Sequence, residues 1–493
     1  MSQPNENRQE QVARTAERCA ERDILIPTFA QQKDPSLIPD AVKAELADIG
    51  LWDVHPRNLF RISWKNDPDS GGFHGVNVME IPRELTGVKP RIFGLVGKYF
   101  PTGAHKVGAT FGCLAPRLVT GTFDPTTQKA VWPSTGNYCR GGAYVASLLA
   151  CESVAILPEE MSRERFEWLE SIGSEVFATP GCESNVKEIY DKCWEIKAER
   201  GDQVVVLNQF DEFGNAMWHY EVTASAIEEV LRDRLGSSER FFGYISATGS
   251  AGTIGAGERL KELYPACKVI ASEALQCPTL LRNGFGGHRI EGIGDKHVPW
   301  IHNVRNTDFI AAVDDEDPMA LIRLFNEPAG RKLLERRGVD PAIVDQLDLL
   351  GISSIGNLLA CIKTAKWNQL DERDALFTIF TDSMELYGSR LAEARAAEGE
   401  YTELMAERDL HLHLLGLKTD HMAELDHWDR NRIHNLKYFT WIEQQQKELD
   451  ELNAQWFDYR DYWPRHWQRA AEYDALIREF NQRSGLAAKY ASS

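Results

Sequence analysis

The chain has 493 residues, with 55 Lys and Arg against 74 Asp and Glu, which gives a formal net charge of −19 at pH 7. This length predicts roughly three compact units at about 150 residues each, and the acidic balance lacks the positive footprint of a nucleic-acid partner. The content of 43% hydrophobic and 26% charged residues excludes a largely disordered, fibrous or membrane-embedded chain.

The first residues and the cysteines predict a cytoplasmic protein. The N-terminal run has no apolar core, so we expect no secretory signal, and no apolar run approaches the roughly 18 residues that a membrane-spanning helix needs. The nine cysteines are scattered from Cys19 to Cys361 without a CxxC pair. This pattern indicates reduced thiols and no disulfide framework.

Short apolar runs alternate with helix-length periodic segments from about residue 91 onward. Strands are expected at 152–158, 174–180, 202–210, 241–249 and 267–274, and helices at 162–173, 185–201 and 252–265. This alternation predicts parallel sheets with helices on both faces.

The composition of the sequence changes after about residue 390, where charged and aromatic residues fill long stretches with helical periodicity. An apolar stripe of coiled-coil-like spacing comprises Ile442, Leu449, Leu452, Trp456, Tyr459 and Trp463. We therefore expect an N-terminal extension with the first strands at 1–90, a core at 91–390, and a helical extension at 391–493 that packs on the core or on a second subunit.

A lysine follows a turn-forming run in the segment GKYFPTGAHKVGA at residues 97–109. The Pro-Thr-Gly turn places Lys106 at the start of an expected helix, where its surroundings lower the pKa of the amine. Such an amine can form a Schiff base with a carbonyl group. A lone lysine of this kind is more often an ordinary surface residue, so the prediction depends on further motifs.

The segment WPSTGNYCRGG at residues 132–142 joins an expected strand to an expected helix. Its small polar residues expose amides and hydroxyls at a helix N-terminus, which is a favourable place for a carboxylate. A plain helix cap would have the same composition.

Small residues also fill the strand-to-helix turn TGSAGT at residues 248–253. Backbone N–H groups of such a turn can surround a phosphate, and the helix dipole adds to the attraction. The segment is neither a Walker A loop nor a clean GxGxxG, and a tight turn is an equally good interpretation.

A run of similar character, GISSIGN at residues 351–357, opens an expected helix that continues to about Trp367. A hydroxyl at this place can bond a ring nitrogen, although serine is also a common helix cap.

The C-terminal region contains a His-x-His pair at His411 and His413. Helix residues two positions apart point to different sides, so one metal ion cannot easily take both imidazoles. We therefore expect no metal site.

In this order, the four motifs resemble the fold type II family of pyridoxal-phosphate enzymes, also called the tryptophan synthase β-family. The resemblance covers roughly residues 75–390 and includes the linking segments LPEEMS at 157–162, NQFD at 208–211 and RIEGIG at 289–294. Most motifs are similar to those of the catalytic cores of cysteine synthase and cystathionine β-synthase, while TGAHK at 102–106 is closer to the tryptophan synthase β-subunit.

The resemblance implies a role for each candidate residue. Lys106 would hold pyridoxal 5′-phosphate as a Schiff base and later carry the proton at Cα, Asn137 would bond the 3′-oxygen of the cofactor, and Ser353 would face the pyridine nitrogen. The phosphate would lie in a loop made of Gly249, Ser250, Ala251, Gly252 and Thr253. The substrate α-carboxylate would lie against Ser134, Thr135, Gly136, Tyr138 and Gln209.

The resemblance also implies a fold and a reaction. The fold would be α/β, with two parallel-sheet subdomains, the smaller of which is inserted at about 113–222, followed by the helical C-terminal extension. The enzyme would be a lyase or transferase of amino-acid metabolism that catalyses β-elimination or β-replacement through an aminoacrylate intermediate. Its partners would be a small amino-acid substrate and further copies of the chain, most simply in a homodimer, with no nucleic acid and no membrane.

Some residues around the expected substrate depart from the family pattern. Tyr138 is bulky where cysteine synthase has a Thr-like residue, and Ala251 replaces a glycine. The acidic residue of the tryptophan synthase substrate loop is absent, which argues against indole chemistry. Two alternatives remain open, namely an ammonia-lyase or dehydratase that forms a keto acid, and a non-catalytic scaffold that retains the fold.

Overall fold

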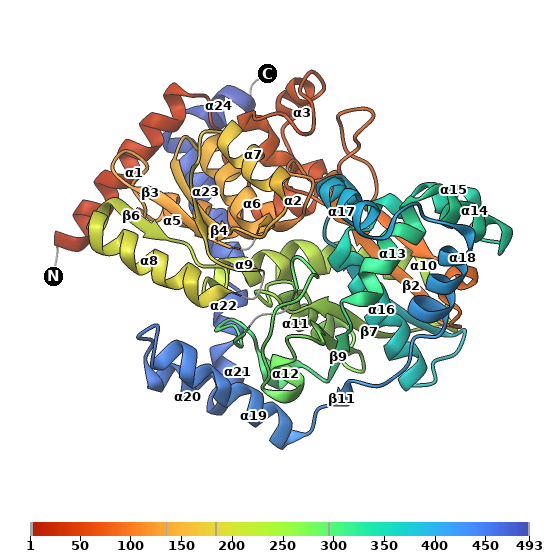
Figure 1. Ribbon diagram of the computed structural model, residues 1–493. Coiled ribbons are helices and arrows are strands. Elements are labelled where there is room, and N and C mark those ends of the chain that lie inside the picture. Colours follow the sequence, from red (N-terminus) through yellow and green to blue (C-terminus); the bar gives the residue numbers. More distant parts are fainter. Residues whose placement is uncertain (1–2, 135, 183–184, 294–295, 492–493) are drawn as a thin grey trace.

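Two β-sheets with helices packed around them form the centre of the molecule (Figure 1). A computed structural model describes residues 3–134, 136–182, 185–293 and 296–491. The larger sheet has seven strands in the order β1-β2-β10-β7-β8-β9-β11, and the smaller has four in the order β5-β4-β3-β6.

The larger sheet is parallel except at its two edges, where β1 pairs with β2 and β11 pairs with β9 in antiparallel fashion. The sequence predicted parallel sheets throughout. The connection from β1 to β2 is too short for the crossover that parallel neighbours require, and β11 arrives from the C-terminal extension. The strands are β1 (Val78–Ile81), β2 (Arg91–Val96), β7 (Arg240–Ala247), β8 (Lys268–Ala274), β9 (Phe309–Val313), β10 (Asp374–Phe380) and β11 (Met422–Glu424).

Strand β10 shows why both faces of the larger sheet are covered, because every residue in it is buried. Leu376 joins an apolar cluster with α16 (Ile352–Trp367), while the next residue, Phe377, joins a cluster that includes α10 (Ala224–Arg234) and α11 (Ile254–Leu263). Successive side chains of a strand point to opposite faces, so the two clusters lie on the two sides of the sheet.

The smaller sheet is parallel and has helices on both faces in the same way. Val131 packs in a cluster with α8 (Val186–Arg200), whereas Trp132 joins the cluster that contains residues of α6 (Asn137–Leu148) and α7 (Arg163–Ser171). Its strands are β3 (Lys129–Pro133), β4 (Glu152–Pro158), β5 (Glu175–Thr179) and β6 (Val204–Val206). The fold is therefore the predicted α/β class with two mainly parallel sheets, and the subdomain boundaries at 113 and 222 stay a prediction.

The predicted elements between residues 152 and 274 are all present. The five predicted strands correspond to β4 to β8, and the three predicted helices to α7, α8 and α11. The ends differ by a few residues, most of all in β6, which is much shorter than the predicted strand at 202–210. The other helices up to residue 345 are α1 (Gln3–Glu21), α2 (Phe29–Lys33), α3 (Asp40–Leu46), α4 (Arg83–Thr86), α5 (Lys106–Val119), α9 (Phe213–Trp218), α12 (Thr279–Arg282), α13 (Glu316–Asn326), α14 (Pro328–Arg336) and α15 (Pro341–Asp345). Among the residues that the structure describes, no helix is both long enough and apolar enough to cross a bilayer.

The C-terminal extension is helical, as the sequence predicted. It contains α17 (Gly388–Glu398), α18 (Glu403–Asp409), α19 (His427–Lys437), α20 (Leu449–Phe457), α21 (Tyr459–Tyr462), α22 (Pro464–Trp467), α23 (Ala470–Arg483) and α24 (Leu486–Ala491). The expected apolar stripe is not continuous, because Ile442 ends one helical segment and Leu449, which begins α20, is 47% exposed. The turn between them rotates the following residues, and only the later part of the stripe, such as Leu452 and Trp463, is buried.

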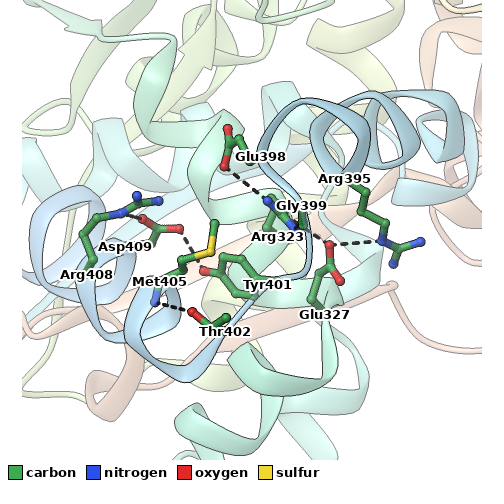
Figure 2. Close-up of polar contacts among 10 residues, drawn as sticks. All are labelled: Arg323, Glu327, Arg395, Glu398, Gly399, Tyr401, Thr402, Met405, Arg408 and Asp409. Carbon is green, nitrogen blue, oxygen red and sulfur yellow. Dashed lines mark hydrogen bonds and ion pairs between the residues drawn. The ribbon is translucent and has the colours of Figure 1, made fainter.

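A polar network fixes the beginning of the extension to the core, as Figure 2 shows. The buried guanidinium of Arg323 on α13 donates to the carbonyl of Gly399 at 2.8 Å and to Glu398 at 3.2 Å. The hydroxyl of Tyr401 donates to Asp409 at 2.9 Å. Arg323 also lies over the Tyr401 ring, so α17 and α18 are held at one point on the core.

A buried lysine anchors the middle of the extension. The Lys437 amine at the end of α19 donates to the carbonyls of Trp300 at 2.9 Å and His302 at 2.7 Å, and to the Gln455 side chain at 2.7 Å. These three acceptors satisfy the ammonium group, and they join α19 and α20 to the core segment that contains Trp300.

The last helices pack against the first ones, since α23 contacts α1 and α2, and α24 contacts α3. The Asp474 carboxylate on α23 accepts hydrogen bonds from the amides of Phe29 at 2.6 Å and Ala30 at 3.1 Å, which caps α2. The Asn481 side chain pairs with both backbone groups of Ile26. The N-terminal and C-terminal segments thus form one structural unit on the core.

Candidate active site

Three turns near the candidate site lie at the carboxyl ends of parallel strands, and the first two contain predicted site residues. Ser134 follows β3, Thr248 follows β7, and Asp382 lies just beyond β10. Ligands of α/β proteins bind at this edge of a sheet. The sequence order of strands and turns therefore brings distant segments to one place.

The turn before α5 places Lys106 at this edge. Gly103 has a φ of +71°, a backbone conformation that favours glycine, and its amide donates to the carbonyl of Phe100 at 2.8 Å. The amide of His105 donates to the carbonyl of Thr381 beyond β10 at 3.3 Å. The first helical residue is Lys106, as the sequence predicted.

The Lys106 amine makes contacts with two other predicted residues. Its Nζ donates to Ser250 Oγ at 3.0 Å and lies 3.4 Å from Gln209 Oε1. Gln209 Nε2 donates in turn to Ser134 Oγ at 3.1 Å. Lysine, candidate phosphate loop and candidate carboxylate loop therefore meet through direct hydrogen bonds.

The candidate phosphate loop is held by a residue that the sequence analysis did not single out. Asn215 on α9 donates through Nδ2 to Ser250 Oγ at 3.0 Å and to the Gln209 carbonyl at 2.9 Å. A Cβ on Gly252 would lie 2.0 Å from Asn215 Oδ1, so this position accepts no side chain. The loop leads directly into α11, whose N-terminus favours an anion.

Backbone conformation and hydroxyl contacts shape the rest of this loop. Ala251 has a φ of +58°, which is unusual for a residue with a side chain and is typical of functional loops. Thr253 Oγ1 lies 2.6 Å from Ser246 Oγ, and the Tyr244 hydroxyl donates to the Thr253 carbonyl at 3.0 Å. The amides that precede α11 are thus held in a defined arrangement.

Asn137 and Ser353 are both buried beside this edge. Asn137 Nδ2 donates to Asp382 Oδ2 at 2.6 Å. Asn137 Oδ1 and Ser353 Oγ have no hydrogen-bond partner among the described residues. Buried polar atoms in native proteins are normally paired, so these two atoms are available to a bound polar group.

The remaining predicted substrate residues differ in their placement. Gly136 precedes α6 with a φ of +156°, and its amide donates to Ser134 Oγ at 3.2 Å. The Tyr138 side chain lies in the core, where it packs edge-on against Trp132 and its hydroxyl donates to the Leu207 carbonyl at 3.2 Å. Thr135 lies outside the described residues.

A charged network beside the loop was not predicted. The Tyr387 hydroxyl donates to Asp382 Oδ2 at 2.8 Å, and Arg165 Nη2 donates to the Tyr387 hydroxyl at 3.0 Å. Arg165 also lies 3.1 Å from Glu291. Burial raises the pKa of the Asp382 carboxyl, although the Arg165 charge and the two hydrogen bonds oppose this effect. Nothing in the sequence joined Asp382 to Arg165, which is more than 200 positions earlier.

Two buried histidines lie beside Lys106. His105 packs edge-on against His219 with ring centroids 5.1 Å apart. Burial lowers the pKa of both imidazoles well below the usual value, and the Lys106 charge adds to the effect. Both rings are therefore neutral at physiological pH.

The residues present fit pyridoxal phosphate. The amides before α11 suit its phosphate, the Lys106 amine suits its aldehyde, and the buried hydroxyl of Ser353 suits its ring nitrogen. The side-chain oxygens of Asn137 and Asn215 also lack partners among the described residues, which leaves polar atoms for the cofactor or the substrate.

Comparisons with known proteins show which proteins the chain is similar to. The family model described as "Pyridoxal-phosphate dependent enzyme" matches residues 84–331. The chain is 30% identical over 271 residues to the probable cysteine synthase of Bacillus subtilis, which covers 54% of this chain and 78% of that protein. It is 24% identical over 331 residues to cystathionine β-synthase of Saccharomyces cerevisiae, which covers 64% of this chain and 61% of the yeast protein, less than two thirds of its length.

Solved structures show the same fold. O-acetylserine sulfhydrylase isoform 3 of Entamoeba histolytica aligns over 69% of this chain and 94% of its own, with a TM-score of 0.56 at 22% identity. O-ureido-L-serine synthase aligns over 63% and 89%, with a TM-score of 0.52 at 22% identity. Since the family model matches half of the sequence, the chain belongs to the family of pyridoxal-phosphate dependent enzymes, and pyridoxal phosphate is its cofactor.

Proposed function

We propose that the enzyme catalyses β-replacement on an amino acid with a β-leaving group, in the manner of cysteine synthase. The observation that carries this proposal is the set of hydrogen bonds from Lys106 Nζ to Ser250 and Gln209 and from Gln209 to Ser134. This set supports the proposal, because it joins the Lys106 amine to the candidate phosphate loop and, through Gln209, to the candidate carboxylate turn.

Each side chain has a proposed task. The bound cofactor supplies the electron sink that makes the substrate α-proton acidic. Lys106 holds the cofactor and moves the proton at the substrate Cα. The loop from Gly249 to Thr253 binds the phosphate, and the neutral hydroxyl of Ser353 faces the ring nitrogen, which it leaves largely without a proton.

The carboxylate-binding turn orients the substrate. Ser134, Gly136 and Gln209 hold the α-carboxylate, and we assign Thr135 the same task from its place in the motif. Asn137 contacts the cofactor beside them. The side chain of Tyr138 is committed to the core, so its contribution to the turn comes from its backbone.

The named relatives favour replacement over simple elimination. Cysteine synthase, cystathionine β-synthase and O-ureido-L-serine synthase are all named for an amino acid that they form. The departures around the substrate leave the leaving group and the incoming nucleophile open.

A screen with purified holoenzyme tests the proposal. O-acetyl-L-serine, O-phospho-L-serine and L-serine are each supplied with sulfide, with homocysteine or without a nucleophile, and amino-acid products and pyruvate are measured by mass spectrometry. A new β-substituted amino acid supports replacement. Pyruvate alone, at the same rate with every nucleophile, would assign the enzyme to the ammonia-lyases instead.

We also infer that the protein works in a reducing compartment such as the cytoplasm, and as a homodimer. None of the nine cysteines, all of which the structure describes, forms a disulfide, and burial raises the pKa of Cys113 and Cys361, among others. Mass measurement in solution tests the oligomeric state.

A further inference from the structure

A buried arginine on α6 has two N–H-bearing atoms without an acceptor among the described residues. Arg140 lies one helical turn after Asn137, and its side chain is only 6% exposed. Its Nε and Nη1 atoms have no hydrogen-bond partner among the described residues. The guanidinium lies 4.6 Å above the Trp168 ring, which fixes its plane but satisfies none of its N–H groups.

No ion pair joins Arg140 to a carboxylate among the described residues, although the nearby Asp382 charge favours the protonated guanidinium and Asp382 Oδ1 has no hydrogen-bond partner there. Arg165, the other arginine of this region, lies against Tyr387 and Glu291, and Asp382 Oδ2 accepts from Asn137 and Tyr387. Burial and the Arg165 charge lower the pKa of Arg140 to about 10, so the group still carries its proton at neutral pH. A buried cation without an acceptor is costly, and a bound anion would remove this cost.

The position along α6 indicates which part of a substrate would reach this group. The candidate carboxylate turn ends at Asn137, and three residues advance a helix by about 4.5 Å. The backbone of Arg140 is therefore about one helical turn from the end of the candidate carboxylate turn. A β-substituent with its own acidic group spans such a distance.

We propose that Arg140 is a specificity residue that binds a negatively charged group on the β-substituent of the amino-acid substrate. This inference rests on the proposed function, because it assumes that the amino acid lies at the turn from Ser134 to Asn137. The ligand chemistry is an anionic oxygen group, and the guanidinium fork suits both a carboxylate and a phosphate.

Binding of amino acids without a leaving group tests the inference without turnover. Holoenzyme is titrated by calorimetry with L-glutamate and with L-glutamine, which have the same shape but differ in charge. A third titration with L-2-amino-4-phosphonobutyrate distinguishes phosphate-like from carboxylate ligands. The variants are Arg140→Met, Arg140→Lys, and the control Arg163→Met on α7, whose side chain is 80% exposed.

We expect the parent enzyme to bind an acidic ligand about tenfold or more tightly than L-glutamine, since a charge-assisted hydrogen bond contributes at least this much. Arg140→Met should remove the preference while binding of L-glutamine persists, Arg140→Lys should restore part of it, and Arg163→Met should retain it. Tighter binding of the phosphonate would identify a phosphate, and tighter binding of L-glutamate a carboxylate.

Equal affinity of the parent enzyme for acidic and neutral ligands overturns the inference and leaves the proposed function intact. The same holds if Arg140→Met keeps the preference, which would show that Arg140 only packs against Trp168. If none of these amino acids binds, both the inference and the proposed amino-acid site are wrong.

Discussion

The amide nitrogen of Asn137 donates to the carboxylate of Asp382 over 2.6 Å, and this contact joins residues that are 245 positions apart. Asn137 begins α6 beside the smaller sheet, whereas Asp382 follows β10 of the larger sheet. Both residues are buried at the candidate site. The orientation of a predicted cofactor ligand therefore depends on how the two sheets pack together.

Removing the Asp382 carboxylate should destabilise the protein. Asp382→Ala leaves the buried donors of Asn137 and Tyr387 without an acceptor, at a cost of roughly 1–3 kcal/mol each. Asp382→Asn keeps an oxygen that can accept both bonds, so its loss should be smaller. Thermal unfolding of the two variants measures the difference, and equal midpoints would show that these bonds contribute little.

The same position should make stability depend on pH. Because burial raises the pKa of Asp382, the folded protein holds this proton more tightly than the unfolded chain does. The contribution to stability then falls as pH rises from about 4, the unfolded value, through the raised folded value, and is constant above it. Asn does not titrate, so the stability difference between the parent and Asp382→Asn should shift in favour of the variant as the pH rises through this window. A difference in midpoint that does not change with pH would refute the assignment.

Lys106→Ala should abolish covalent cofactor attachment. Treatment of the parent with borohydride should fix the cofactor to the protein and increase its intact mass, whereas the variant should keep the mass of the bare chain. Turnover should fall by about 100-fold or more, since the variant loses its proton-transfer group. Lys89→Ala, at a side chain that is 69% exposed, is the matched control. A mass increase in the Lys106 variant would place the attachment on another lysine.

Gly252→Ala should weaken cofactor binding, because the new Cβ would lie 2.0 Å from Asn215 Oδ1. Overpacking of this kind costs about 1–3 kcal/mol, which corresponds to roughly tenfold or more in affinity. Titration of the apoprotein with pyridoxal phosphate measures the effect. Gly75→Ala, where a Cβ meets no atom within 4 Å, should bind normally.

A double variant separates steric conflict from other effects. Gly252→Ala combined with Asn215→Ala should lose less affinity than the sum of the two single losses, because the smaller side chain at 215 removes the conflict. Strict additivity would indicate that the loop does not pack against Asn215 in the holoenzyme.

Lys437→Met should loosen the C-terminal extension. The change leaves three buried acceptors, on Trp300, His302 and Gln455, without their donor, at a cost on the order of 3 kcal/mol. Limited proteolysis should then cleave the extension before the core. Lys418→Met, in the same extension, serves as a control, and identical cleavage patterns would show that Lys437 does not anchor the extension.

The regular elements of the core could be predicted from the sequence because their signals are local. The apolar run at 152–158 and the Gly-terminated helix after it appear as β4 and α7. The antiparallel edge strand β11 could not be predicted, because its partner β9 is more than 100 positions earlier. The apolar stripe of the extension was misleading, since its spacing does not reveal the turn between Ile442 and Leu449.

The parts of the candidate site that could be predicted are those whose residues belong to short continuous sequence motifs. Lys106, Ser250 and Gln209 come together as the motifs imply. Asn215 was missed because it lies among apolar residues on α9 and acts only through its contacts with Ser250 and Gln209. Arg140 was part of a noted segment, but its burial without an acceptor is a property of the packed structure alone.

The pairing of Ile26 with Asn481 has a consequence for how the cell makes this protein. These residues are separated by 455 positions, which take roughly 20 to 90 s to translate at about 5–20 residues per second. Throughout this interval the emerging first helices lack the surface of α23 on which they pack. Nascent chains on the ribosome should therefore need chaperone protection. A polypeptide that ends before Asp474 should be degraded and should not accumulate in folded form.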